Sequence, residues 1–134
     1  MREYINSLAH DGNQAGHDLN TMSQCIHARN IGAGWWHDLQ TGEKLERNDG
    51  ELICLMHSEL SEALEGVRKG AMDDHLPNRP MVEVEMADTI IRILDYCGAR
   101  NLDVGGAMIE KLAYNANRAD HKRENRIKDG GKKV

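Results

Sequence analysis

Two pairs of acidic residues lie inside stretches whose apolar residues follow the period of an α-helix. Glu59-Leu-Ser-Glu62 holds the first pair and Glu85-Met-Ala-Asp88 the second, with residues 63–84 between them. Positions i and i+3 of a helix share a face, with Cβ atoms about 5–6 Å apart, so each pair directs two carboxylates to one place. Two such helices packed antiparallel would bring four carboxylates together. Because like charges raise one another's pKa, such a cluster calls for cations.

The position of each acid around its helix supports this interpretation. At about 100° per residue, Glu59 falls inside an apolar arc that includes Leu55 and Ala63, and Glu62 lies at the edge of that arc. An acid among core residues costs on the order of several kcal/mol unless it is paired or bound to a metal. On the later helix one stripe beside the apolar arc carries Glu85, Asp88, Arg92 and Asp95.

Clustered carboxylate oxygens are typical ligands of Mg²⁺, with Mn²⁺ as the second choice. We therefore predict a metal site made of Glu59, Glu62, Glu85 and Asp88. The competing interpretation is a solvated charged face with i,i+4 ion pairs such as Asp88–Arg92. Two matched pairs on consecutive helices favour the metal.

The remaining pattern predicts an all-α chain, because no alternating β-branched run occurs. Helices are expected from about His17 to Asn30, Asp49 to Lys69 and Met81 to Arg100, and from an N-cap at Asp103 to about Arg123. Residues before the first helix are expected to be irregular or to form a short helix. We expect one domain over residues 1–134, built as a four-helix bundle, with 1–16 and 125–134 flexible. The wide apolar arc of the third helix favours a second subunit, and the alternative is that this helix lies at the centre of its own bundle.

Composition limits the partners and the compartment. The net charge of −5 argues against a nucleic-acid-binding protein, which normally carries a basic face. No apolar run approaches the length of a membrane span. Three widely spaced cysteines, without a C-x-x-C motif, are expected to be small buried residues in a reducing, cytoplasmic compartment.

The fourth expected helix carries charges of the opposite sign. Lys111, Asn115 and Arg118 share one face, with Tyr114 on its flank. Two cations and an amide donor on one face can hold phosphate oxygens. The alternative is that both cations are surface residues whose stems cover a partly buried face.

Trp35 and Trp36 lie together where the first expected helix ends. A large ring at such a corner can stack on a nucleobase, which is worth about 1–3 kcal/mol. The alternative is a ring that seals the core, and the doublet leaves room for one ring in each role.

Taken together, these segments resemble the MazG-like all-α nucleotide pyrophosphohydrolases. The resemblance covers about residues 18–120 and rests on Gly34-Trp35-Trp36, the two acidic motifs and the K-x-x-x-N-x-x-R of Lys111, Asn115 and Arg118. It implies a cytoplasmic hydrolase that converts (deoxy)nucleoside triphosphates to monophosphates and pyrophosphate with Mg²⁺ held by the four acids. It also implies a homodimer or homotetramer with sites between subunits. The sequence leaves open the base, the number of metals and the carboxylate that acts as base.

Three other classes of protein share parts of this pattern. A di-iron carboxylate bundle needs Glu-x-x-His motifs, which do not follow either acidic pair. An HD-type metallophosphohydrolase needs a His-Asp doublet, and His17-Asp18 and His37-Asp38 are candidates. A noncatalytic nucleotide sensor or helical partner protein would keep the same helices and acids without turnover.

Overall fold

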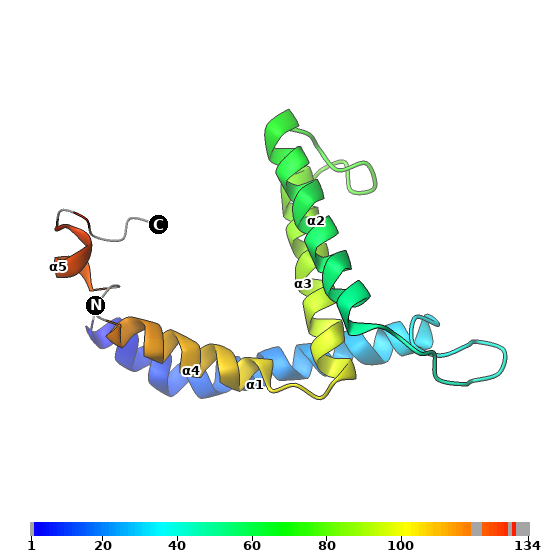
Figure 1. Ribbon diagram of the computed structural model, residues 1–134, viewed down its shortest axis with the longest axis horizontal. Coiled ribbons are helices and arrows are strands. Elements are labelled where there is room, and N and C mark those ends of the chain that lie inside the picture. Colours follow the sequence, from blue (N-terminus) through cyan, green and yellow to red (C-terminus); the bar gives the residue numbers. More distant parts are fainter. Residues whose placement is uncertain (1, 119–121, 129, 131–134) are drawn as a thin grey trace. The chain divides into compact units, whose positions relative to one another are not determined.

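A computed structural model of the chain describes residues 2–118, 122–128 and 130. This part of the chain is helical, with no strand and two isolated β-bridges, His37 to Lys44 and Met72 to Pro80. The all-α expectation is therefore confirmed. The helices are α1 (Arg2–Gly32), α2 (Asp49–Lys69), α3 (Met81–Ala99), α4 (Val104–Asn117) and α5 (Arg123–Arg126) (Figure 1). No helix among the described residues is both long enough and apolar enough to cross a membrane.

The helix that carries the first acidic pair has the bounds expected for it. The side chain of Asn48 accepts a hydrogen bond from the backbone N–H of Glu51 and caps the N-terminus of α2. Gly70 ends the helix with φ 59°, a left-handed conformation that glycine adopts without steric cost. α3 ends one residue before the expected Arg100, and Asp103 caps α4 as predicted, by accepting from the N–H of Gly106.

The expected start of the first helix was wrong, because α1 begins at Arg2 rather than near His17. Gly12 and Gly16 lower helix propensity, which argued for a later start. The structure shows why glycine occurs at the contact of the two helices: a Cβ added to Gly16 of α1 would lie 3.2 Å from the backbone carbonyl of Gly105 in α4, and a Cβ added to Gly105 would lie 2.0 Å from the carbonyl oxygen of Gly16. The two helices approach closely at these glycines, and this packing supports a helix that local propensity disfavours.

The expected end of the fourth helix was also wrong. α4 stops at Asn117, and Arg118 is extended with φ −65° and ψ 133°. The side chain of Asn117 donates to the carbonyl of Ala113, a local bond that competes with helix continuation. The short α5 follows, so part of the segment expected to be flexible is helical. Flexibility of 1–16 and 125–134 stays a prediction, and residues 119–121, 129 and 131–134 lie outside the described residues.

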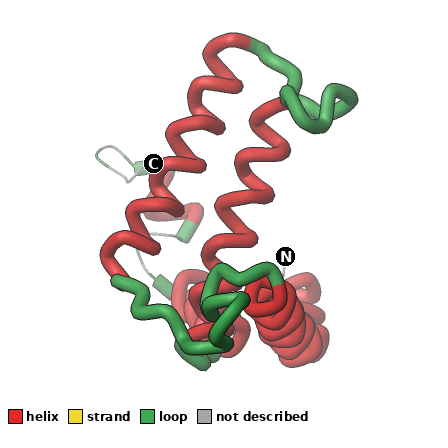
Figure 2. The backbone as a smooth tube through the Cα atoms, turned by 90° about the vertical axis from the view of Figure 1, so that its right-hand side faces the viewer, coloured by secondary structure: helices red, strands yellow, loops and turns green. Residues whose placement is uncertain are grey.

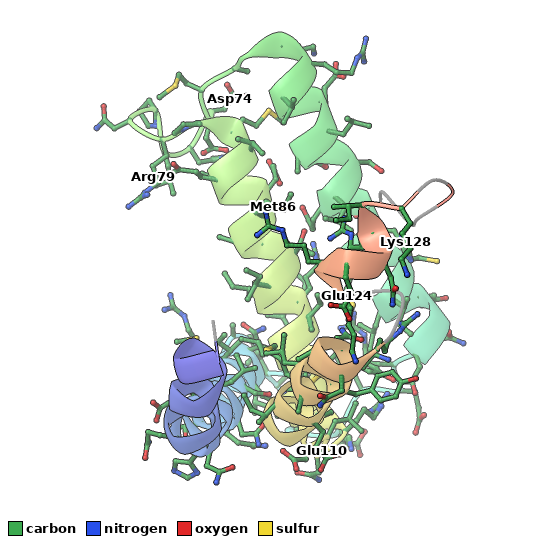
Figure 3. All side chains as sticks on the ribbon, turned by 90° about the vertical axis from the view of Figure 1, so that its left-hand side faces the viewer. Asp74, Arg79, Met86, Glu110, Glu124 and Lys128 are labelled. Carbon is green, nitrogen blue, oxygen red and sulfur yellow. The ribbon has the colours of Figure 1, made fainter. Side chains whose placement is uncertain are left out.

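By compactness the chain divides into two units, which we describe separately. The first unit comprises residues 1–20 and 103–134, and the second comprises residues 21–102. The second unit contains α2 and α3, which run antiparallel and side by side, together with the C-terminal part of α1 (Figure 2). Asp74 and Arg79 lie in the loop that joins α2 to α3 (Figure 3). The predicted four-helix bundle stays a prediction.

The contact between α2 and α3 is polar, which reverses part of the expected pattern. The side chains buried along these helices include Glu59, Glu85 and Thr89, next to the small Ala63 and Gly66. Large apolar residues of α2 and α3 are exposed, namely Leu60, Val67, Met86, Ile90 and Ile93. Each helix of a hairpin contacts its partner along one narrow stripe, so the rest of a wide apolar arc lies outside this contact.

Of the three cysteines expected to be buried, only Cys97 is. Cys25 and Cys54 are exposed. Burial raises the pKa of the Cys97 thiol, which keeps it protonated and unreactive.

Candidate metal centre

A cluster of three carboxylates lies between α2 and α3. Glu59 comes from α2, and Glu85 and Asp88 come from α3; one oxygen of each lies within 4.8 Å of the others. The residues Glu59 and Glu85 are 8% and 7% exposed, and Asp88 is less buried. The helices can approach because small residues face the contact: a Cβ added to Gly66 would lie 3.1 Å from Met81. In the part of the chain that the structure describes, this is the only group of His, Cys, Asp or Glu close enough to hold an ion.

The raised pKa of Glu85 indicates that the acids of this cluster have too little positive charge around them. Several causes together raise the pKa of Glu85 to about 6, of which burial is the largest and the charge of Glu62 the next. Glu59, through a hydrogen bond and its charge, and Asp88, through its charge, contribute to the same shift. Each cause penalises the ionised form of Glu85, and a cation bound to the cluster would oppose all of them.

Glu62 occupies a more peripheral position than the other three acids. Its side chain is exposed, and it is not one of the three carboxylates that converge. Its charge nevertheless acts on Glu85. The structure therefore brings three of the four predicted ligands together and leaves Glu62 at the margin of the cluster.

Arg92 supplies the positive charge that the cluster contacts. Its Nε lies 2.5 Å from Oε1 of Glu59, across the contact between α3 and α2. The competing interpretation paired Arg92 with Asp88 on the same helix, but the guanidinium pairs with Glu59 of the neighbouring helix instead. The geometry thus contradicts a purely local charged face, because the pair joins two helices.

A pocket of about 390 Å³ lies beside the cluster within the second unit. Asp88, a member of the acidic cluster, lines this pocket. Arg92, which pairs with Glu59 of the cluster, lines it too. The remainder of the lining combines aromatic, apolar and polar side chains: Asn30, Trp35, Trp36, Arg47, Leu52, Leu55, Ile91, Asp95 and Tyr96. A flat ring with an attached anion matches this combination of surfaces.

The two tryptophans take different roles. Trp36 is 2% exposed, and its ring packs edge-on against His27 with ring centroids 5.1 Å apart. Trp35 is 62% exposed and lines the pocket. Trp36 is thus the ring that seals the core, and Trp35 is the exposed ring.

Asp95 anchors the wall of this pocket. Its Oδ1 lies 2.8 Å from Nδ1 of His27, and its Oδ2 accepts from Asn30 Nδ2 at 2.8 Å. The indole Nε1 of Trp36 donates to both oxygens at 3.0 Å. The sequence placed Asp95 on the acidic stripe of α3 without a role. The i,i+3 spacing of His27 and Asn30 was the available signal that two donors share a face.

Two arginines that lie over the Trp36 ring were missed from the sequence, and one of them, Arg47, lines the pocket. The guanidinium of Arg47 lies 5.5 Å from the centre of the Trp36 ring, and its Nη1 donates to the carbonyl of Trp35. Arg100 lies 5.6 Å from the Trp36 ring centre and is held by Asp49 through its Nε at 2.9 Å. Arg47 comes from an irregular loop, so no periodicity could have indicated where it points.

The predicted phosphate-binding residues belong to the first unit. On α4, Lys111 Nζ lies 4.7 Å from the centre of the Tyr114 ring. Arg118 lies 5.9 Å from the same ring, but it follows the helix rather than lying on it. Asn115 is half-buried near the end of α4. Lys111 and Arg118 thus share the exposed Tyr114 ring as a common surface.

Neither His-Asp doublet forms a metal cluster within the described residues. Asp38 accepts hydrogen bonds from the backbone N–H groups of Gln40 and Thr41, which close a turn and lower the pKa of Asp38. Asp18 accepts from Gln14 on the same helix. These contacts assign both aspartates local structural roles.

Comparison with known proteins yields no relative: no family model, no curated protein and no solved structure matches this chain. The side chains of the acidic cluster and of the pocket beside it are therefore the basis for inferring a function.

Proposed function

We propose that this chain is a Mg²⁺-dependent hydrolase that converts (deoxy)nucleoside triphosphates to monophosphates and pyrophosphate, as its resemblance to the MazG-like enzymes implies. The observation that carries the proposal is the convergence of Glu59, Glu85 and Asp88 at the edge of the pocket lined by Trp35. A cluster of oxygens next to a pocket with an exposed aromatic ring suits a ligand that is anionic at one end and flat at the other.

The donor set fits a hard divalent cation. All the candidate ligands are carboxylates, which favour Mg²⁺ or Mn²⁺ over softer metals. The raised pKa of Glu85 supports the fit, because it reports acids with too little neighbouring positive charge. Glu59, Glu85 and Asp88 would hold the ion, with Glu62 at the margin. A bound cation would lower the pKa of its water and neutralise charge that builds on the phosphoryl oxygens.

In the proposed reaction, water attacks the α-phosphorus. A new P–O bond forms, the bond from that phosphorus to the α,β-bridging oxygen breaks, and pyrophosphate leaves with the bonding electrons. A carboxylate of the acidic cluster accepts the proton from the attacking water. Trp35 stacks on the base, and Trp36 and Asp95 hold the pocket wall in shape. On the first unit, Lys111, Asn115 and Arg118, with Tyr114 beside them, are the residues proposed to bind phosphate.

We further propose that the chain acts as a homodimer or homotetramer. The support is the number of large apolar side chains exposed on α2 and α3: Leu60, Leu64 and Val67 are 43%, 61% and 63% exposed, and Met86 and Ile90 are 46% and 53% exposed. Monomeric proteins rarely leave contiguous apolar surface of this kind in water. A second copy would cover it by the isologous pairing that is usual in dimers.

A noncatalytic nucleotide sensor is the second candidate, favoured by the ion pair between Arg92 and Glu59, which stabilises the cluster without a cation. Pyrophosphate release, measured with a panel of nucleotides in Mg²⁺, separates the two. Turnover of at least one nucleotide is expected, and chelation of the metal should stop it. Nucleotide binding with no release for any member of the panel would favour the sensor.

Matched variants on one helix sharpen this assay. Glu59→Gln should lower turnover by at least about a hundredfold, since it removes a metal ligand. The control is Glu65→Gln, because Glu65 also lies on α2 but pairs at the surface with Arg68 and Lys69. Its turnover should match that of the wild type. Full activity in the Glu59→Gln protein would contradict the assignment.

A further inference from the structure

Arg92 contacts both the acidic cluster and the pocket. Its side chain is 42% exposed, whereas the Glu59 side chain that it contacts is 11% exposed. The same arginine lines the pocket together with Asp88. One end of the ion pair is thus fixed between the helices, and the other is a long side chain with access to solvent.

The atom that Arg92 contacts is one that a cation would need. Glu59 contributes a carboxylate oxygen to the cluster, and Arg92 Nε lies 2.5 Å from Oε1 of this carboxylate. A divalent cation and a guanidinium at one carboxylate repel each other, and both draw on the same lone pairs. The two positive groups therefore compete for Glu59.

A displaced Arg92 has another acceptor within reach when the pocket holds a phosphate. Guanidinium groups bind phosphate oxygens through paired, charge-assisted hydrogen bonds. The pocket brings Arg92 to the surface that a bound ligand would touch. Its contact with Glu59 neutralises part of the cluster until a cation does so.

We propose that a divalent cation displaces Arg92 from Glu59, and that the freed guanidinium then binds phosphate oxygens of the ligand in the pocket. This inference rests on the proposed function and adds an order to it, in which the cation binds first and makes a phosphate-binding arginine available. Arg92 is then a substrate-binding residue whose availability depends on the metal.

Direct titration of Mn²⁺, followed by the electron paramagnetic resonance signal of the free ion, tests the first half without turnover. In the absence of nucleotide, Arg92→Gln should bind Mn²⁺ roughly threefold to tenfold more tightly than the wild type, because its competitor is gone. Arg47→Gln is the control: Arg47 also lines the pocket but makes no ion pair with the cluster among the described residues. Its Mn²⁺ affinity should stay within about twofold of the wild type, the change that long-range charge alone would give.

Calorimetric titration with pyrophosphate at saturating Mn²⁺ tests the second half. Arg92→Gln should weaken pyrophosphate binding by roughly tenfold, the loss of one charge-assisted contact. Arg92→Lys keeps the positive charge and changes the surface less than Arg92→Gln does. Its affinities for Mn²⁺ and for pyrophosphate should lie between those of the wild type and of Arg92→Gln. Opposite changes in metal and phosphate affinity are not expected from a merely structural residue.

Specific outcomes would overturn the inference. Equal Mn²⁺ affinity in the wild type and Arg92→Gln, or an equal gain in Arg47→Gln, would show that Arg92 does not compete with the cation for Glu59. Unchanged pyrophosphate binding in Arg92→Gln would show that Arg92 does not bind phosphate, while leaving the proposed hydrolase intact. Failure of the wild type and both Arg92 variants to bind Mn²⁺ would instead overturn the metal site itself, and the proposed function with it.

Discussion

Asp95 and Glu85 are acids on the same face of α3, yet their surroundings differ in kind. Asp95 is surrounded by donors: His27, Asn30 and Trp36 all hydrogen-bond its carboxylate. Glu85 is surrounded by acids, and its pKa rises to about 6. The first carboxylate has its partners within the described chain, and the second lacks a positive partner there.

This difference separates a structural acid from a candidate functional one. A partly buried carboxylate with several donors stabilises the fold, because its desolvation is offset by hydrogen bonds. A buried carboxylate among like charges destabilises the fold unless a cation is bound. Perturbed acids of the second kind are typical of functional sites. Burial alone does not distinguish the two, but the identity of the neighbours does.

The largest expected effect is on stability when Asp95 is removed. Asp95→Ala should lower the free energy of unfolding by about 2–4 kcal/mol, since the donors of Trp36, Asn30 and His27 lose their acceptor. Glu85→Gln, the matched change of an acid on α3, should leave stability unchanged or raise it in metal-free buffer. Urea unfolding followed by circular dichroism measures both. A Glu85→Gln protein as unstable as Asp95→Ala would break the contrast.

The next effect compares Trp35, the exposed ring of the pocket, with Trp36, the buried ring that donates to Asp95. Trp35→Ala should weaken binding of a nonhydrolysable deoxynucleotide by about 1–3 kcal/mol, the worth of one stacked base, with little loss of stability because Trp35 is exposed. Trp36→Ala should chiefly destabilise the fold, because that ring is buried and bonded to Asp95. Tryptophan fluorescence, which nucleotide should quench in the wild type, reports binding. Unchanged affinity in the Trp35→Ala protein would show that the pocket does not stack a base.

The smallest effect is the pH dependence that Glu85 gives to the metal-free protein. The folded-state pKa of Glu85, about 6, lies above its ordinary value of 4.5, so the folded state holds the proton more tightly. The stability that this gives is fully present below pH about 4.5 and is lost as the pH rises through about 6. Relative to Glu85→Gln, the free energy of unfolding should therefore fall over that window.

Denaturant titrations at several pH values, with and without Mg²⁺, measure this fall. Saturating Mg²⁺ should abolish it above pH 6 in the wild type, because a cation favours the ionised carboxylate. The Glu85→Gln protein supplies the baseline. Identical pH profiles for the two metal-free proteins would contradict the view that Glu85 lacks a positive partner.

Local signals predicted a substantial part of the fold. The bounds of α2, its αL cap at Gly70 and the cap of α4 at Asp103 agree with the sequence, because capping depends on residues within one turn. The burial of Glu59 followed from its angular position among apolar neighbours. Where tertiary packing decides whether a segment is helical, the prediction was wrong. The start of α1 is the example, because the glycines in its first half pack against α4.

The sequence by itself determined which residues share a helix face, because the 3.6-residue period fixes that locally. It could therefore pair Glu85 with Asp88 and place Asp95 and Arg92 on the same stripe. Only the tertiary structure decided what each of these side chains meets: Glu59 for Arg92, three donors for Asp95, and other acids for Glu85. It also decided that Trp36 is buried and Trp35 exposed. Partners on other elements depend on how helices pack, and packing is set by contacts between residues distant in sequence.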